Sequence, residues 1–162
     1  MEINIIDYSP KYLLDFERLN KEWLEKYFVI EDVDSQLFKD PYRGIIEKPG
    51  FILFAKVSQS IVGTGAIVKS GEKWELTKLA VTDGYQSQGI GKLLATKLIE
   101  KAYQSGATEI FIVTNTILEK AIGLYKNLGF NIIHEGDHPK YKRGNLVLEL
   151  MLDTSYSPTT KY

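Results

Sequence analysis

The segment formed by residues 75–92 constrains the fold of this chain more than any other part of it. Its first seven residues, E-L-T-K-L-A-V, are typical of a strand, and Asp83-Gly84 predicts the turn that follows. From Gly91 onward the apolar residues recur at helical spacing, which predicts an α-helix. The start of such a helix has unpaired N–H groups and a partial positive charge of about half a unit, so it favours an anion such as a phosphate.

Two glycines in this segment allow the backbone to come close to a ligand. Gly89 and Gly91 place no side chain between the backbone and such a ligand. The segment is not a Rossmann fingerprint, because Leu94 stands where a third glycine is required. It is not a P-loop either, because Leu93 follows Gly91-Lys92 in place of serine or threonine. A plain helix start without a ligand is the alternative interpretation of these residues.

Composition limits the class of protein and of partner. A chain of 162 residues is expected to form one domain with one core. The formal net charge of −1 gives no electrostatic case for nucleic acid or an anionic membrane as a partner. The absence of cysteine excludes disulfides, thiolate metal sites and a cysteine nucleophile. No apolar run approaches the roughly 20 residues of a membrane span, and the N-terminus lacks a basic signal-peptide start, so we expect a cytoplasmic protein.

The letters H-E-x-x-H run from His134 to His138 and match a zinc-binding pattern. That pattern works because its two histidines lie one turn apart on a helix. Here Gly136 lies between them and Pro139 follows, and residues 130–133 are typical of a strand. We therefore predict two solvated histidines in a loop and no metal site. The G-x-S-x-G motif of many serine hydrolases does not occur in the chain.

Hydrophobic periodicity predicts a mixed α/β domain over residues 1–153, with a polar tail at 154–162 that frays. Antiparallel hairpins and one strand–helix–strand crossover through the glycine turn are expected in it. The expected strands are 3–6, 51–57, 61–68, 73–81, 109–114, 130–134 and 146–152. The expected helices are one that opens at Ser9-Pro10, a short one at 34–39, the glycine-turn helix to about residue 104, and one at 117–128.

The helix at residues 117–128 contains a second candidate functional residue. Its apolar stripe is expected to pack on the sheet, and Gly129 is expected to close it. Tyr125 lies in this stripe and is either a core residue or a phenol at the edge of the core. A phenol in that position can donate a proton to a leaving group.

The two segments, about 35 residues apart, together resemble the GNAT superfamily of acetyl-CoA-dependent N-acetyltransferases. The signature Q/R-x-x-G-x-G/A is matched at Gln86, Gly89 and Gly91. The later motif A-x-x-L-Y-x-x-x-G-F is matched at Ala121, Leu124, Tyr125, Gly129 and Phe130. The order of the expected elements is also that of the family, and the end of the chain looks like the small single-domain bacterial members.

The resemblance implies an α/β GNAT fold, with a mixed, mostly antiparallel sheet of about seven strands and about four helices. It also implies that strands 75–81 and 109–114 splay apart, and that acetyl-CoA (or CoA) is the co-substrate. The pyrophosphate would lie on the N–H groups of residues 88–92, beside Gln86 where many relatives have arginine. The pantetheine arm would follow residues 79–81. The implied cofactor contacts are Leu79, Ala80, Val81, Gln86, Ser87, Gln88, Gly89, Ile90, Gly91, Lys92, Asn115, Ala121 and Tyr125.

The family's reaction is direct attack of an amine on the thioester in a ternary complex. The resemblance implies Glu75 as the base that removes the amine proton, with a structural strand carboxylate as the alternative. A backbone N–H near Leu79 or Ala80 would hold the carbonyl oxygen, and Tyr125 would protonate the leaving sulfur. Many relatives have asparagine where this chain has Leu118, and Asn115 is the candidate substitute.

The acceptor is expected to be the primary amine of a small or amino-acid-like molecule, bound by residues 23–34, the loop before residue 51, and residues 138–143. Glu31, Asp32 and Asp34 would attract a cationic amine and Arg143 a carboxylate, unless all four are solvated loop charges. Two alternatives are acetylation of a protein N-terminus or lysine, and a sensor that binds acetyl-CoA without turnover. Many relatives pair through their late strands, so the resemblance allows a homodimer.

Overall fold

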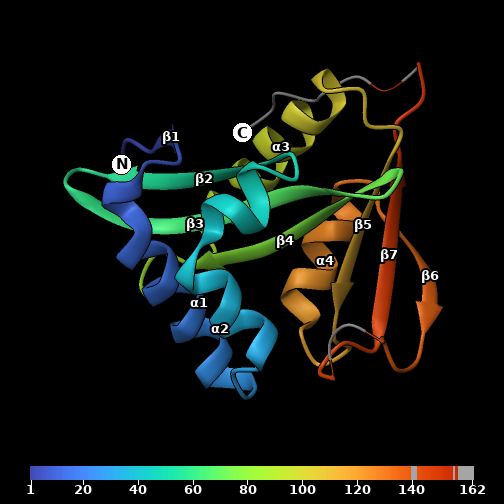
Figure 1. The fold of residues 1–162 in the computed structure, drawn as a ribbon, viewed down its shortest axis with the longest axis horizontal. Coiled ribbons are helices and arrows are strands. Elements are labelled where there is room, and N and C mark those ends of the chain that lie inside the picture. Colours follow the sequence, from blue (N-terminus) through green and yellow to red (C-terminus); the bar gives the residue numbers. More distant parts are fainter. Residues whose placement is uncertain (140–141, 155, 157–162) are drawn as a thin grey trace.

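A computed structural model describes residues 1–139, 142–154 and 156 of the chain. These residues form a seven-stranded sheet in the order β1-β2-β3-β4-β5-β7-β6 (Figure 1). The strands are β1 (Asn4–Asp7), β2 (Gly50–Val57), β3 (Ser60–Ser70), β4 (Lys73–Val81), β5 (Glu109–Thr114), β6 (Asn131–Glu135) and β7 (Leu146–Met151). The α-helices are α1 (Leu13–Tyr27), α2 (Asp32–Lys39), α3 (Ile90–Gln104) and α4 (Glu119–Asn127), with short turns η1 (Pro10–Tyr12) and η2 (Tyr42–Ile46).

The sheet is mixed and mostly antiparallel, as predicted. Strands β1 to β4 form an antiparallel meander, and β5, β7 and β6 form a second antiparallel group. The two groups meet at β4 and β5, which run parallel and pair only at Trp74–Ile110 and Glu75–Phe111. Beyond these pairs the two strands leave their shared end in different directions (Figure 1). The predicted splay between strands 75–81 and 109–114 is therefore confirmed.

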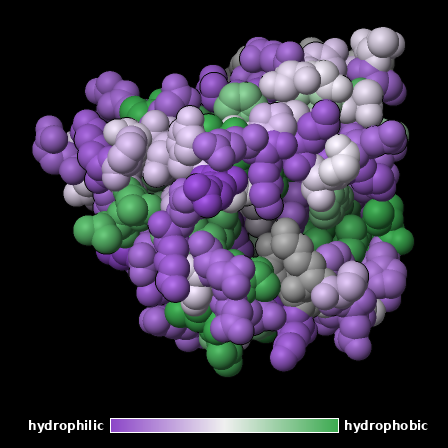
Figure 2. Space-filling model, viewed as in Figure 1, coloured by the Kyte–Doolittle hydropathy of each residue, from purple (hydrophilic) through white to green (hydrophobic). Residues whose placement is uncertain are grey.

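Helices cover both faces of the sheet, and each face has its own core. Leu94 and Leu98 of α3 pack on one face together with Tyr125 of α4. Phe16 of α1 and Phe38 of α2 pack on the other face. Strand β3 is buried on both sides along its centre, which explains why it has a continuous apolar run instead of alternation. On the surface seen in Figure 2 hydrophilic residues predominate, and hydrophobic ones form small separate groups.

Several element boundaries differ from the prediction for local reasons. Residues 42–46, expected as loop, form the single π-helical turn η2, whose Ile45 is buried. Helix α2 starts at Asp32, two residues early, because the Asp34 carboxylate accepts the backbone N–H of Glu31 at 3.0 Å. Helix α4 starts at residue 119 instead of 117. Gly129 follows its end with a φ of 101°, the left-handed conformation predicted for it.

The two remaining local predictions concern the histidines and the tail. His134 lies in the exposed edge strand β6, so the H-E-x-x-H letters do not form the helical zinc motif. Most of the predicted tail at 154–162 lies outside the described residues. Of its described members, Tyr156 packs on Tyr103 with ring centroids 5.2 Å apart.

Candidate active site

The divergence of β4 and β5 opens a cleft of about 770 Å³. This volume is within the range of about 300–1,000 Å³ that is typical of small-ligand sites. The second half of β4, the loop that leads into α3, the end of β5, the start of α4 and the last turns of α1 line it. The predicted cofactor residues all line the cleft with the exception of Gln88. The cleft thus brings the two motifs of the sequence together.

The loop before α3 presents backbone donors at one end of the cleft. The first hydrogen bond of α3 runs from the Leu93 N–H to the Gly89 carbonyl at 3.0 Å. The N–H groups of Ile90 and Gly91, which precede Leu93, are therefore outside the helical ladder. Gly89 has a φ of 85°, a conformation that glycine adopts without strain. The predicted unpaired helix start is present, and its backbone borders the cleft.

Gly91 has a different role from Gly89. A Cβ atom at position 91 would lie 3.7 Å from Leu124 Cδ2 and 4.0 Å from Val81 Cγ2. Both of those residues line the cleft, from α4 and from β4. Glycine at position 91 therefore keeps open the space between the two walls.

The glutamine side chains of the loop bind within the loop itself. Gln86 Nε2 donates to the Val81 carbonyl at 2.9 Å and to Asp83 Oδ1 at 3.3 Å. Gln88 Nε2 donates to the Gly84 carbonyl at 3.1 Å. Gln86 was expected to contact a pyrophosphate, but its amide nitrogen already has these partners. In this structure the glutamine side chains shape the loop, and residues 85–87 and 89–92 line the cleft.

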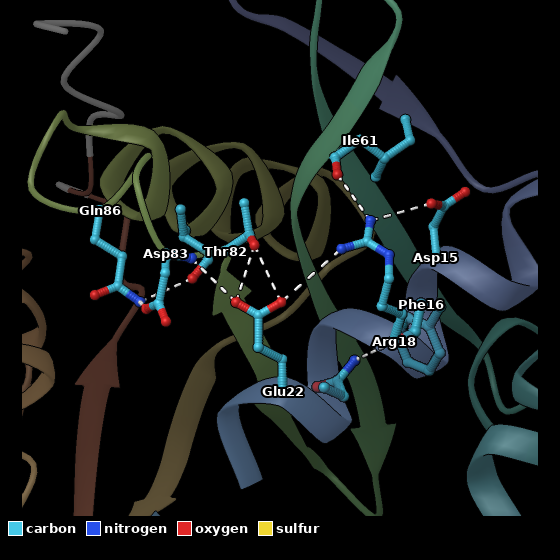
Figure 3. A network of polar contacts seen from close by, with 10 residues as sticks. Asp15, Phe16, Arg18, Glu22, Ile61, Thr82, Asp83 and Gln86 are labelled. Carbon is cyan, nitrogen blue, oxygen red and sulfur yellow. Dashed lines mark hydrogen bonds and ion pairs between the residues drawn. The ribbon is translucent and has the colours of Figure 1, made fainter. Parts of the chain in front are cut away.

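Helix α1 holds the same loop from the side (Figure 3). The two carboxylate oxygens of Glu22 accept the Thr82 hydroxyl at 2.9 and 3.0 Å, and one of them accepts the Asp83 N–H at 3.0 Å. Arg18 NH1 lies 4.0 Å from this carboxylate, and Arg18 NH2 donates to the Ile61 carbonyl at 3.0 Å. The loop that leads to the helix start is thereby fixed to α1 and to β3.

Tyr125 reaches the cleft from α4. Its side chain lines the cleft, and its ring packs edge-on against Phe130 at 6.1 Å between centroids. Among the residues that the structure describes, none forms a hydrogen bond with the Tyr125 hydroxyl. Burial raises the pKa of Tyr125 to about 12. The phenol is therefore protonated at neutral pH and can donate a hydrogen bond or a proton to a ligand.

Glu75 is buried in the part of the sheet where β4 and β5 still pair. It lies opposite Val68 on β3 and beside Phe111 on β5, just before the two strands diverge. The lining of the cleft begins with the next residue, Leu76, and does not include Glu75. The structure does not bring this carboxylate into the cleft, so its role as the base stays a prediction.

Asn115 lines the cleft at the end of β5, and both ends of its amide are bound by protein groups. Its Nδ2 donates to the Arg143 carbonyl at 2.6 Å, and its Oδ1 accepts the Ile117 N–H at 3.0 Å. These bonds attach the loop between β6 and β7 to the segment before α4. The predicted contact of Asn115 with the cofactor stays a prediction.

Of the charged residues expected to bind the acceptor, Glu31, Asp34 and Arg143 form a cluster of ion pairs. Arg143 NH1 lies 2.7 Å from Glu31 Oε2, and its two terminal nitrogens each lie 2.8 Å from an oxygen of Asp34. Lys78 Nζ lies 3.0 Å from the same Asp34 carboxylate, which is fully buried. Arg143 and Lys78 line the cleft, whereas Glu31 and Asp32 do not. The negative charge of Glu31, which was predicted to attract an amine, is therefore neutralised by Arg143.

The pKa of Asp34 shows how these charges compensate. Burial by itself raises the pKa of this carboxyl, but the hydrogen bond from Arg143 and the charge of Lys78 lower it further than burial raises it. The resulting pKa is about 2. The carboxylate is thus ionised at all moderate pH values, and it fixes two cations at the edge of the cleft.

Lys78 reaches this cluster because β4 contains a bulge. The register of β3 and β4 shifts between Thr64 and Ala66, and Lys78 has a φ of 56°. In a bulge of this kind two residues of one strand face one residue of the other, which redirects a side chain. The sequence predicts a regular strand at β4. A regular strand pattern does not indicate that the Lys78 side chain reaches Asp34.

Comparisons with known proteins identify the family of this chain. A model of the acetyltransferase (GNAT) family matches residues 14–130. The chain is 30% identical over 103 residues to an uncharacterized N-acetyltransferase, YvbK, of Bacillus subtilis, which covers 61% of this chain and 66% of that protein. It is 37% identical over 82 residues to N-acetyltransferase 8 of Rattus norvegicus, which covers 47% of this chain and 37% of that protein. This chain therefore spans less than two thirds of either relative.

Solved structures extend the likeness to the whole fold. A GNAT acetyltransferase of Staphylococcus aureus superposes with a TM-score of 0.85 at 25% identity, over 94% of this chain and all of that one. A putative acetyltransferase of Salmonella typhimurium, crystallised with acetyl-CoA, gives a TM-score of 0.77 at 17% identity, over 99% of this chain and 100% of that one. The chain belongs to the GNAT family of acetyltransferases.

No group of three or more histidine, aspartate or glutamate side chains that could hold a metal ion occurs among the described residues. No helix within the described ranges is long and apolar enough to cross a membrane.

Proposed function

We propose that this protein binds acetyl-CoA in the cleft between β4 and β5 and transfers its acetyl group to a primary amine of a small or amino-acid-like molecule. The observation that carries the proposal is the continuity of the cleft. One opening, lined by the splayed strands, reaches from the unpaired N–H groups at the start of α3 to Tyr125. The acetyl-CoA in the related Salmonella structure supports this assignment.

The residues present fit the co-substrate. The N–H groups of residues 89–92 would hold the diphosphate, because they carry the partial positive charge of a helix start. Gly91 leaves room for it between Val81 and Leu124. The pantetheine arm would follow Leu79 to Val81, where β4 has no partner strand on the β5 side. Acetyl-CoA supplies the chemistry of the reaction, an acetyl group activated as a thioester.

The protein's own groups would handle two protons and one developing charge. A backbone N–H near Leu79 or Ala80 stabilises the negative charge on the carbonyl oxygen. Tyr125 donates a proton to the departing sulfur, and its phenol is protonated at neutral pH. Glu75 remains the proposed base, and because it does not line the cleft, a water molecule has to relay the proton to it.

A combined binding and turnover experiment tests this function. Calorimetric titration with CoA and acetyl-CoA measures binding, and thiol release in the presence of a panel of amines measures transfer. We expect saturable binding and amine-dependent thiol release with a stoichiometric N-acetyl product. Binding without any amine-dependent release supports the sensor alternative, and release only with peptides that carry a free N-terminus or lysine supports protein acetylation. Absence of binding at millimolar CoA refutes the proposal. Gel filtration of the same sample tests the predicted homodimer.

A further inference from the structure

The last turn of α1 adds an aromatic wall to the cleft. We name the three residues Trp23, Tyr27 and Phe28 the aromatic wall; all of them line the cleft. Their rings contact one another, with centroids 6.1 Å apart for Trp23–Tyr27, 5.8 Å for Trp23–Phe28 and 6.4 Å for Tyr27–Phe28. Tyr27 is 45% exposed and the other two are half-buried, so the wall offers apolar surface to a ligand.

The aromatic wall lies on the side of the sheet opposite to the proposed diphosphate site. Helix α1 packs on one face of the sheet and α3 on the other. The cleft passes between them through the divergence of β4 and β5. An acceptor that approaches from the α1 side therefore meets the wall before it reaches Leu79 and Tyr125.

The charges around this side do not favour a second ammonium group. Of the described residues that line the cleft, Glu119 at the start of α4 carries the single carboxylate. The cations Lys78 and Arg143 line the cleft on the acceptor side, and the carboxylates that pair with them, Glu31 and Asp34, stand outside its lining. Because Glu31 and Asp34 are already paired with Arg143 and Lys78, these carboxylates attract a second ammonium group on the acceptor only weakly.

We propose that the acceptor is an amine with an aromatic or similarly flat apolar group, which packs on the aromatic wall, and that it has no second cationic group. This inference rests on the proposed function and specifies its acceptor. Contact between a buried aromatic ring and aromatic side chains stabilises a complex beyond the burial of apolar area, because ring edges and faces carry opposite partial charges. In the reaction an N–C bond forms as the C–S bond breaks, the amine loses a proton and the sulfur gains one.

A comparison of two amines tests this inference separately from the proposed acetyltransferase function. Thiol release is measured with 2-phenylethylamine and with 1,4-diaminobutane at equal concentrations and pH. We expect kcat/KM to be at least ~10-fold higher for the aromatic amine, in line with the discrimination that apolar pockets achieve. An equal or higher value for the diamine overturns the inference and leaves the acetyltransferase function intact. No release with any amine, despite CoA binding, overturns both.

Variants of the aromatic wall test whether its residues cause the preference for an aromatic amine. Tyr27→Ala alters an exposed side chain and is expected to fold, whereas Trp23→Ala tests the more buried ring. We expect each to raise KM for 2-phenylethylamine several-fold, to lower the preference for it over the diamine, and to leave the CoA Kd within a factor of about two. Tyr42→Ala is the control, because Tyr42 is 49% exposed on η2 and does not line the cleft. If both wall variants lose activity equally for both amines, the wall has only a structural role and the inference is wrong.

Discussion

Glu22 and Thr82 are 60 positions apart in the sequence, yet the Thr82 hydroxyl lies 2.9 and 3.0 Å from the two carboxylate oxygens of Glu22. The same carboxylate accepts the N–H of Asp83. These bonds tie α1 to the loop that presents the backbone donors of the proposed diphosphate site. A negatively charged residue thus supports a site for an anion by fixing its position, although its charge by itself opposes anion binding.

Glu22→Ala is expected to weaken CoA binding. A hydrogen bond to a charged group contributes about 1.5–3 kcal/mol, and partial exposure of Glu22 places the loss near the lower end, about a tenfold rise in Kd. Calorimetry with CoA measures it, and Glu25→Ala, an exposed change on the same helix, is the control. Tighter binding by Glu22→Ala would mean that Glu22 acts only through its charge.

Gly91→Ala is expected to weaken CoA binding without loss of stability. Its Cβ makes ordinary contacts with Leu124 and Val81, and alanine favours a helix, but the methyl group occupies ligand space. Gly89→Ala should instead destabilise the fold by about 1 kcal/mol, because its φ of 85° strains any residue with a Cβ. Thermal unfolding and CoA titration of both variants separate the two effects. Equal CoA affinity of Gly91→Ala and the unmodified protein would place the ligand elsewhere.

Tyr125→Phe is expected to lower turnover at least ~10-fold while CoA still binds, because loss of a general acid typically costs about 10²- to 10⁴-fold. The pH dependence follows from the raised pKa. With a pKa of about 12 the donor form of Tyr125 persists through the neutral and moderately alkaline range. The rate should therefore not fall between pH 7 and 10 through deprotonation of this residue. Turnover equal to that of the unmodified protein would assign Tyr125 to packing alone.

Asp34→Asn is expected to destabilise the protein by about 3 kcal/mol at pH 7, because it leaves two nearly buried cations with a neutral partner. The folded-state pKa of Asp34 is lowered from 3.8 to about 2, so its ionisation stabilises the fold above about pH 4. This contribution, roughly 2 kcal/mol, is lost as the pH falls from about 4 through 2.

Denaturant unfolding at pH 7 and pH 3 measures the stability of the Asp34→Asn variant, and its difference from the unmodified protein should narrow at the lower pH. Asp32→Asn, an exposed change in the same helical turn, should shift stability by less than about 1 kcal/mol. A difference for Asp34→Asn that is constant with pH would show that the ion pairs do not stabilise the fold.

Local patterns were sufficient to predict most of the secondary structure. The continuous apolar run of β3, the helical spacing in α3 and the glycine that closes α4 each have a short-range physical cause. The splay of β4 and β5 was different, because it came from the resemblance to a family. Nothing in the two strand sequences alone indicates where they stop pairing.

Side-chain partners across long separations could not be predicted. Arg143 and Asp34 are 109 positions apart, and their pairing depends on how the loop between β6 and β7 lies against α2. The charge of Glu31 and of Arg143 suggested contact with an acceptor, but a charge does not reveal which partner it has. Lys78 was missed because a bulge is a property of the register between two strands.

Consecutive residues of α1 serve two parts of the cleft: Glu22 holds the loop before α3, and Trp23 belongs to the aromatic wall. A small tilt of α1 would move both contacts at once. We therefore expect each substrate to change the affinity for the other by the same factor, as thermodynamic linkage demands.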